Sequence, residues 1–213
     1  MPPLPPIPPT PRTDGERRAT LEDRLANTPL FLAAFNIPPH RHPDTRALDL
    51  LAAILSRGQS SRLFQRLVKD ERAALNVFVY LDSRVGPGLL VVQAIPNQGV
   101  ELARIEALVW EELEKVKTGG VTARELEKAK NQILAGQIFA RQTVFQKSDA
   151  LHHYRLYHGD PAAIDTDLDR YAAVTADEIR RVARTYLVPA NRTVLHVRPA
   201  PRPAASGPDT PAR

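Results

Sequence analysis

Histidines and an acidic residue gather near position 40, where His40, His42 and Asp44 form the pattern H-x-H-x-D. Alternate side chains of an extended segment point to the same side, so the two imidazoles could bind one metal ion together. Pro43 and Asp44 also have the features of a helix start, because an acidic group there suits the positive end of the helix dipole. We interpret this motif as a helix start and keep metal binding as the less favoured alternative.

A second histidine cluster lies in the string HHYRLYH, which contains His152, His153 and His158. Adjacent residues of a helix point about 100° apart, so His152 and His153 cannot easily bind the same ion. His153 and His158 are five positions apart and are also poorly aligned. We interpret all three as surface or groove residues. His196 stands alone in the last predicted strand and is expected on one face of a sheet. We predict no metal site in this chain.

Ser60, Ser61 and Arg62 follow Gly58 at the predicted start of a helix. Backbone amides at such a position can bind a carboxylate or a peptide carbonyl. The guanidinium of Arg62 presents several donors to the same groups. These three residues are the candidate substrate-binding residues, although helix capping alone also accounts for the two serines.

The sequence excludes several classes of catalytic site. The chain has no cysteine, so thiol catalysis and thiolate metal binding are impossible. It contains no Glu-His or His-Glu dipeptide, so neither the H-x-x-E-H nor the H-E-x-x-H zinc motif can be written. A G-x-S-x-G nucleophile elbow and a glycine-rich phosphate loop are also missing. We predict no catalytic residue in this chain.

The composition indicates one folded domain between two flanking segments. The chain has 213 residues, 43% of them hydrophobic, which is enough for one sizeable core. The formal net charge is +5, but basic and acidic residues are interspersed, so we predict no nucleic-acid partner. No apolar run could span a bilayer and no signal peptide is visible, which leaves the compartment open between cytoplasm and periplasm. We predict a proline-rich linker over 1–14, the domain over 15–199 and a disordered tail over 200–213.

Hydrophobic periodicity and turn signals predict the elements that must position these residues. Strands are predicted over 17–25 at an edge, 29–37 inside the sheet, 77–81 and 89–95 as a hairpin, and 193–197 at the end. Helices are predicted from Asp44 to Gly58, after Ser60 or Ser61, after Pro96 to Gly119, and from Thr122, Asp160 and Thr175. Strand pairs thus alternate with blocks of helices. The predicted fold class is α+β, with a roughly five-stranded, mostly antiparallel sheet and helices packed on one face.

Several strings taken in order resemble one known family. The segment HPDTRALDLLAAILSRGQSSRLFQRLVKDERAALNV resembles the opening of the non-catalytic domain of the pitrilysin family, which includes insulinase and the mitochondrial processing peptidase. The runs VTARELEKAKNQ, HGDPAAID and VTADEIRRVARTYLVPANRTVLHVRP are similar to the close of that domain. The resemblance covers roughly residues 15–199, and its specificity lies in the succession of the strings.

The resemblance implies a chamber built from two similar α+β halves. The first half carries the H-x-x-E-H zinc site, and the second half closes over the substrate without that site. In some members the second half also supplies an arginine and a tyrosine to the substrate. This sequence departs from that pattern, because Val68 and Leu75 stand near those positions and neither Arg66 nor Arg72 is followed by a tyrosine at the right spacing. Tyr80 is too far along and is expected in the sheet.

The resemblance therefore implies a non-catalytic half of a zinc metalloendopeptidase that forms a chamber wall and helps to bind a peptide. The expected partners are a zinc-bearing catalytic half or subunit and a polypeptide substrate. No cofactor is expected in this chain, zinc is expected in the partner, and the chain alone is expected to be inactive. The alternative is a stand-alone interaction or assembly module that has the same fold and no role in proteolysis.

Overall fold

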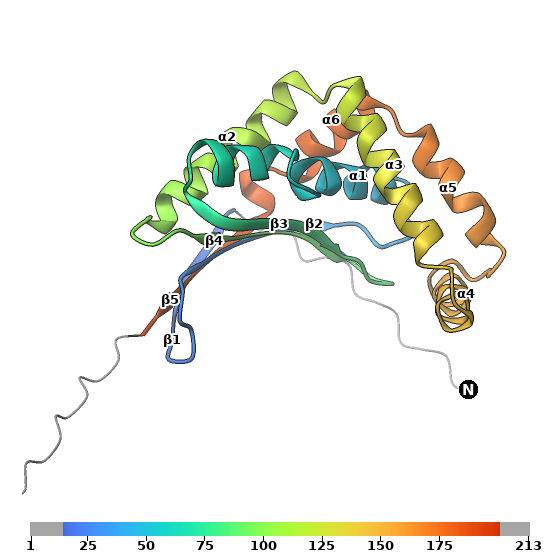
Figure 1. The fold of residues 1–213 in the computed structure, drawn as a ribbon, viewed down its shortest axis with the longest axis horizontal. Coiled ribbons are helices and arrows are strands. Elements are labelled where there is room, and N and C mark those ends of the chain that lie inside the picture. The colour runs from blue at the N-terminus through green and yellow to red at the C-terminus, as the bar shows by residue number, and fades with distance from the viewer. Residues whose placement is uncertain (1–14, 201–213) are drawn as a thin grey trace, which may run out of the picture.

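The computed structural model describes residues 15–200, which form one sheet covered on one face by helices (Figure 1). The strands are β1 (Arg17–Asp23), β2 (Leu30–Ile37), β3 (Ala74–Asp82), β4 (Gly88–Pro96) and β5 (Arg192–Pro199). Their order across the sheet is β1-β5-β2-β4-β3. Only β1 and β5 run parallel to each other, and the other neighbouring pairs are antiparallel. The predicted α+β fold and mostly antiparallel sheet are confirmed.

The helices follow the pattern of start signals in the sequence. They are α1 (Asp44–Ser56), η1 (Phe64–Asp70), α2 (Leu102–Gly119), α3 (Ala123–Phe139), α4 (Val144–His158), α5 (Ala163–Ala173) and α6 (Ala176–Tyr186), with a short 3-10 turn, η2 (Pro189–Asn191), before β5. Thr122 and Thr175 each begin a helix through a complete capping box, as predicted from T-x-x-E. Within residues 15–200, no helix is long and apolar enough to cross a membrane.

Side-chain alternation decides which face of the sheet is covered. In β2 and β4 every second residue is buried, and Phe31 and Phe35 are fully enclosed. These side chains meet the helical layer, where α1 buries almost its whole length, including Leu48, Leu51 and Leu55. The alternate residues of the same strands are only half-buried. The core therefore lies between the sheet and the helices, and the other sheet face stays open.

Two local elements differ from those predicted. The chain between 139 and 160 forms a separate helix, α4, which begins with a capping box of Thr143 and Gln146. Tyr154 is the single buried residue of α4, which lies at the end of the helical layer, away from the sheet (Figure 1). The helix predicted after Ser61 has π-type bonding over Phe64–Asp70, which is rare in proteins. The predicted linker over 1–14 and most of the predicted tail lie outside the described residues.

Candidate functional site

The predicted substrate-binding residues lie together at the start of η1, and their polar groups are bonded within the chain. The Ser61 hydroxyl donates to the Gly58 carbonyl at 2.6 Å, and Lys128 donates to the Ser60 hydroxyl at 2.5 Å. Arg62 donates to both carboxylate oxygens of Glu125, at 2.6 and 2.8 Å. These bonds hold the pKa of Glu125 down at about 2, mainly through Arg62. The role of the three residues in substrate binding stays a prediction.

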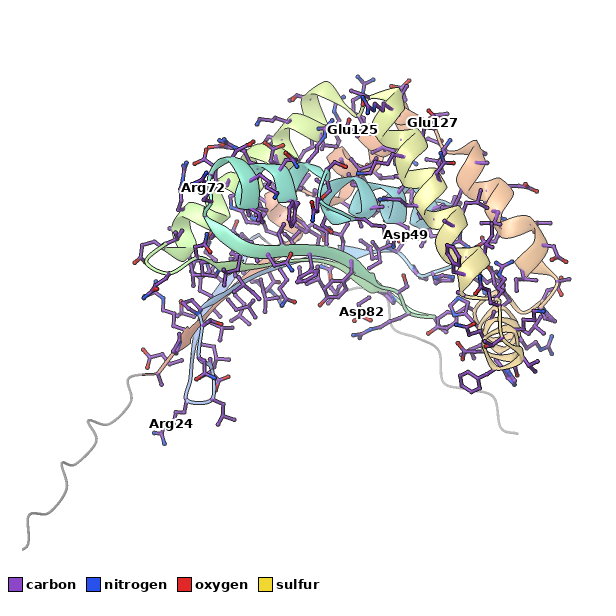
Figure 2. The ribbon with its side chains drawn as sticks, viewed as in Figure 1. Arg24, Asp49, Arg72, Asp82, Glu125 and Glu127 are labelled. Carbon is purple, nitrogen blue, oxygen red and sulfur yellow. The ribbon has the colours of Figure 1, made fainter. Side chains whose placement is uncertain are left out.

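Figure 2 places this cluster relative to the sheet. Glu125 projects from the helical side of the molecule, whereas Asp82 lies at the end of β3 on the side of the open sheet face. The cluster around Arg62 and the open face of the sheet are thus two separate surfaces.

The open face carries apolar side chains across all five strands. One row runs from Phe78 on β3 through Gln93 and Leu32 to Leu195 on β5 and Ala19 on β1. A neighbouring row begins at Tyr80 and crosses Val91 and Ala34. Phe78 and Tyr80 are 45% and 46% exposed, and Leu21 on β1 is 50% exposed. Among residues 15–200, the helices lie on the opposite side of the sheet, and the sheet bends so that this open face is on the inner side (Figure 1).

A groove of about 490 Å³ runs between α1 and the outer edge of β3. Phe78 and Tyr80 line this groove and also belong to the open face, so the two surfaces are continuous. Beside this groove, the backbone of β3 is not entirely free to pair with another strand. The Ser56 hydroxyl accepts from the Val79 amide at 2.7 Å and lies 3.3 Å from the Val79 carbonyl. A bound segment would therefore meet side chains here rather than extend the sheet at Val79.

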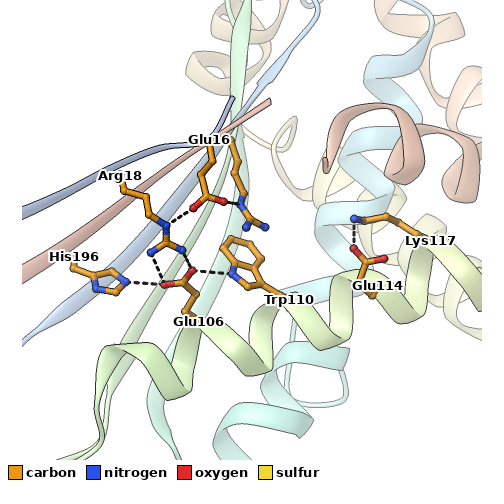
Figure 3. A network of polar contacts seen from close by, with 8 residues as sticks. Glu16, Arg18, Glu106, Trp110, Glu114, Lys117 and His196 are labelled. Carbon is orange, nitrogen blue, oxygen red and sulfur yellow. Dashed lines mark hydrogen bonds and ion pairs between the residues drawn. The ribbon is translucent and has the colours of Figure 1, made fainter. Parts of the chain in front are cut away.

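A first polar cluster pins the opposite edge of the sheet to α2 (Figure 3). Glu106 is buried and accepts hydrogen bonds from Arg18 on β1, from the Trp110 indole at 2.9 Å and from His196 on β5 at 3.0 Å. Burial raises the pKa of Glu106, but the bonds from Arg18 and Trp110 lower it more, so the net shift is downward. His196 lies on one face of the sheet, as expected.

A second cluster brings together histidines that the sequence places far apart. His40, from the segment between β2 and α1, meets His153 and His158 of α4, and one ring nitrogen from each lies within 4.8 Å of the other two. The Nε2 atoms of His40 and His158 are 3.2 Å apart. Tyr157 packs against the rings of His40 and His153, with centroids 5.1 and 4.6 Å away. The expectation that His153 and His158 are poorly aligned is wrong, because one ring nitrogen of each lies within 4.8 Å of the other and of His40.

The other two histidines of these motifs have different partners. His42 stays at the start of α1, where its Nδ1 accepts from the Asp44 amide at 3.2 Å. Asp44 in turn accepts from Arg181 and Tyr186 of α6, which explains its position at this helix start. His152 lies 2.8 Å from the Ser148 carbonyl of its own helix. The H-x-H-x-D motif is thus divided between two places, and its helix-start interpretation fits Asp44.

Burial keeps the central histidine neutral. Desolvation, with a smaller contribution from nearby Arg46, lowers the pKa of His40 to about 4. Burial also lowers the pKa of His158. No local sequence signal announces this cluster, since His40 and His158 are 118 positions apart and only the packing of α4 unites them.

The described residues form a five-stranded α+β layer with helices on one face, and the sequence contains no H-x-x-E-H motif. The sequence profile described as "Peptidase M16 inactive domain" matches residues 1–133. The chain therefore belongs to the peptidase M16 inactive-domain family, which confirms the resemblance seen in its sequence.

Curated relatives agree with this assignment. An uncharacterized zinc protease of Mycobacterium tuberculosis is 29% identical over 187 residues, which make up 87% of this chain and 42% of that protein. The zinc protease PqqE of Helicobacter pylori is 24% identical over 188 residues, or 88% of this chain and 42% of that protein. This chain thus spans less than half the length of either relative.

Solved structures share the fold. A protease from Helicobacter pylori superposes with a TM-score of 0.84 at 23% identity, covering 92% of this chain and 47% of that chain. An inactive peptidase domain from Bordetella parapertussis superposes with a TM-score of 0.76 at 28% identity, covering 86% of this chain and 97% of that one. The matched region makes up nearly the whole of the Bordetella parapertussis chain.

Proposed function

We propose that this chain is the non-catalytic half of a zinc metalloendopeptidase and forms the chamber wall that encloses a polypeptide together with a zinc-bearing half. Family membership and the span of less than half of the curated relatives support such a partner. The zinc ion, the activated water and the general base come from that partner, where zinc lowers the pKa of the attacking water. The chain alone is then expected to have no peptidase activity.

The observation that carries the proposal is the open, inward-bending face of the sheet. Contiguous exposed apolar surface on a folded protein marks a contact with another polypeptide. Here one row crosses all five strands and is apolar except at Gln93, and the open face reaches the groove beside α1 through Phe78 and Tyr80. Aromatic rings of this kind supply large contact area with few rotatable bonds. An extended peptide is the ligand class that such a surface accommodates without requiring a particular sequence.

The groove and the open face would contribute different contacts to a bound peptide. The open face offers apolar contact along the length of a substrate, whereas Asp49 adds a carboxylate to the groove lining. Tyr171 donates to Asp49 at 2.7 Å, which orients this carboxylate. Arg62 belongs to the separate cluster on the helical side, so a substrate contact there would be additional to the groove. Testing the two surfaces independently separates these contributions.

The experiment reconstitutes the chain with an H-x-x-E-H polypeptide encoded beside it or upstream of it. Assembly is measured by size-exclusion chromatography, and cleavage by a quenched fluorescent peptide in the presence of zinc. We expect the double variant Phe78→Ser, Tyr80→Ser to raise KM at least severalfold while assembly is retained. The matched control is Val144→Ser at the start of α4, because Val144 is 85% exposed and lies far from the sheet. Arg62→Ala tests the predicted contact on the helical side.

Three outcomes contradict the proposal. Cleavage by the isolated chain that scales with its bound zinc would place catalysis in this half. Unchanged kinetics in the double variant would remove the open face from substrate binding. Failure to assemble with any H-x-x-E-H polypeptide, together with stable binding to another protein, would instead support the stand-alone interaction module.

A further inference from the structure

We propose that His40, His153 and His158 form a binding site for a divalent transition-metal ion, with zinc as the ion their chemistry suits best. The site lies outside the open sheet face and does not depend on the proposed function. Neutral imidazole nitrogens are common zinc ligands, and three of them form a recurrent ligand set. The ion would connect the segment before α1 to the carboxyl-terminal end of α4.

The geometry is close to that of a bound ion. One ring nitrogen of each histidine lies within 4.8 Å of the other two, and the His40 and His158 Nε2 atoms are 3.2 Å apart. Zinc–nitrogen bonds of about 2.1 Å in a tetrahedron place two ligand nitrogens about 3.4 Å apart. The His40–His158 pair already meets this spacing. Small rotations of the His153 ring complete the set.

Among the described residues, the only hydrogen bond of the three rings joins the Nε2 atoms of His40 and His158. The Nδ1 atom of His40 is buried and has no hydrogen-bond partner among the described residues. Within residues 15–200, no carboxylate is hydrogen-bonded to any of the three rings. The nearest buried carboxylate, Asp167, is already occupied by Arg46 at 2.6 Å and by Tyr154 at 2.8 Å. The cluster thus leaves the His40 Nδ1 atom without a partner and has no anionic group bonded to its rings, and a bound cation would replace the direct contact between His40 and His158.

The remaining histidines provide an internal comparison. His196 donates to Glu106, His42 accepts from the Asp44 amide, and His152 lies against the Ser148 carbonyl. Each has a polar partner of complementary kind. Only in the cluster do imidazoles face one another, and neutral imidazoles that converge in this way can share a bound cation.

The fourth position of the proposed site is open. A cavity of about 340 Å³ adjoins His40 and His153, and Asp149, one turn before His153 on α4, lines it. Water or the Asp149 carboxylate can therefore complete the coordination. The consequence for the fold is local, because Tyr154 is the single buried residue of α4. A bound ion would add to the attachments that Tyr154 makes to Asp167 and that Arg41 makes to the Tyr157 carbonyl.

The test uses the full chain without a polyhistidine tag. Protein is stripped with EDTA, dialysed, and titrated with zinc chloride by calorimetry and with cobalt chloride by visible absorption. We expect one ion per chain, a cobalt spectrum of four-coordinate type, and a rise in melting temperature on addition of zinc. His40→Ala, His153→Ala and His158→Ala should each weaken zinc binding by at least about 10–100-fold, the loss that outer-shell changes alone already cause.

His152→Ala is the matched control, since it removes the histidine next to His153 on the same helix and should leave the affinity unchanged. Circular dichroism in EDTA verifies that each variant is folded, and His158→Gln replaces His158→Ala if the latter fails to fold. Zinc binding weaker than millimolar in the unaltered chain would overturn the proposal. So would binding that survives all three substitutions, or binding that His152→Ala weakens as much as they do.

Discussion

Two polar clusters hold the two ends of this molecule, and they differ in what they leave unpaired. At one end, Glu106 joins β1 and β5 to α2 and accepts from Arg18, Trp110 and His196. At the other end, His40 joins the segment before α1 to the histidines of α4. Both clusters connect distant parts of the chain. Only the Glu106 cluster contains both a carboxylate and a guanidinium that bond to each other.

The difference separates a structural cluster from a binding site. Glu106 accepts four hydrogen bonds, two of them from Arg18, which fill the lone-pair sites of a carboxylate. The Glu106 cluster is therefore explained by the stability that it gives to the sheet edge. Three facing imidazoles with an unpaired buried nitrogen have such capacity. The fully hydrogen-bonded Glu106 cluster is therefore assigned a structural role, and the His40 cluster is assigned the proposed metal ion.

The largest loss of unfolding free energy is expected at Asp167, which bonds to Arg46 and to Tyr154 of α4. Asp167→Ala leaves Arg46 without its buried partner and removes the acceptor of the Tyr154 hydroxyl. Breaking a buried ion pair in this way costs about 3–5 kcal/mol of unfolding free energy, which urea denaturation in EDTA measures. Asp169→Ala, an exposed change on the same helix, should stay within about 0.5 kcal/mol. Equal losses in the two variants would show that this ion pair does not hold α4.

A smaller loss is expected at the Glu106 cluster. Glu106→Gln keeps the shape of the side chain but removes the charge that Arg18 and His196 share, so we expect a loss of about 2–3 kcal/mol by urea denaturation. The control is Glu114→Gln, which breaks an exposed pair with Lys117 on the same helix (Figure 3) and should cost less than about 1 kcal/mol. A loss no greater than that of the control would mean that the cluster contributes little to stability.

Acid should reduce the stability that the Glu106 cluster provides. The folded-state pKa of Glu106 lies below its ordinary value of 4.5, so the unfolded chain takes up the proton first as the pH falls. The stability that Glu106 provides is therefore present above pH 4.5 and is lost as the pH falls below it. Urea midpoints measured from pH 7 to pH 3 should converge for the unaltered chain and Glu106→Gln. Parallel curves would contradict the assigned shift.

The smallest effect is expected for His40→Leu in the presence of EDTA. This change removes a buried nitrogen that has no partner, which offsets the loss of the ring contacts and of the neutral hydrogen bond to the half-buried His158. The net change should stay within about 1 kcal/mol. His196→Leu should cost more, since Glu106 loses a hydrogen-bond partner. Adding zinc should raise the melting temperature of the unaltered chain but not that of His40→Leu. A large loss in EDTA would show that the His40 cluster is complete without an ion.

Local patterns predicted most of the fold. The capping boxes at Thr122 and Thr175, the hairpin strands and the inner strand all depend on residues close in sequence, and all are confirmed. The family was also identified from strings distributed over the domain. The parallel pairing of β1 with β5 was not predicted, because strand alternation is the same in parallel and antiparallel neighbours.

The site was less accessible to sequence reasoning. Nothing within a few residues of His40 indicates that α4 will pack beside it, and α4 itself was missed although Thr143 and Gln146 form its cap. The open sheet face became visible only when the helices were placed on the opposite side. Ser60, Ser61 and Arg62 were predicted to bind substrate because they stand at a helix start. In the structure they are hydrogen-bonded to Lys128, Gly58 and Glu125, respectively.

The order of the strands has a consequence for how the protein is made. β1 has β5 as its sole neighbour in the sheet, and Arg17 pairs with Thr193. A ribosome adding roughly 5–20 residues per second therefore leaves β1 without a partner for roughly ten seconds or more after it emerges. During that interval its hydrogen-bonding groups are open to other chains. Completion of the domain thus coincides with the arrival of its last strand. A ribosome that stalls before β5 would leave β2, β4 and β3 without the strand that joins β1 to them.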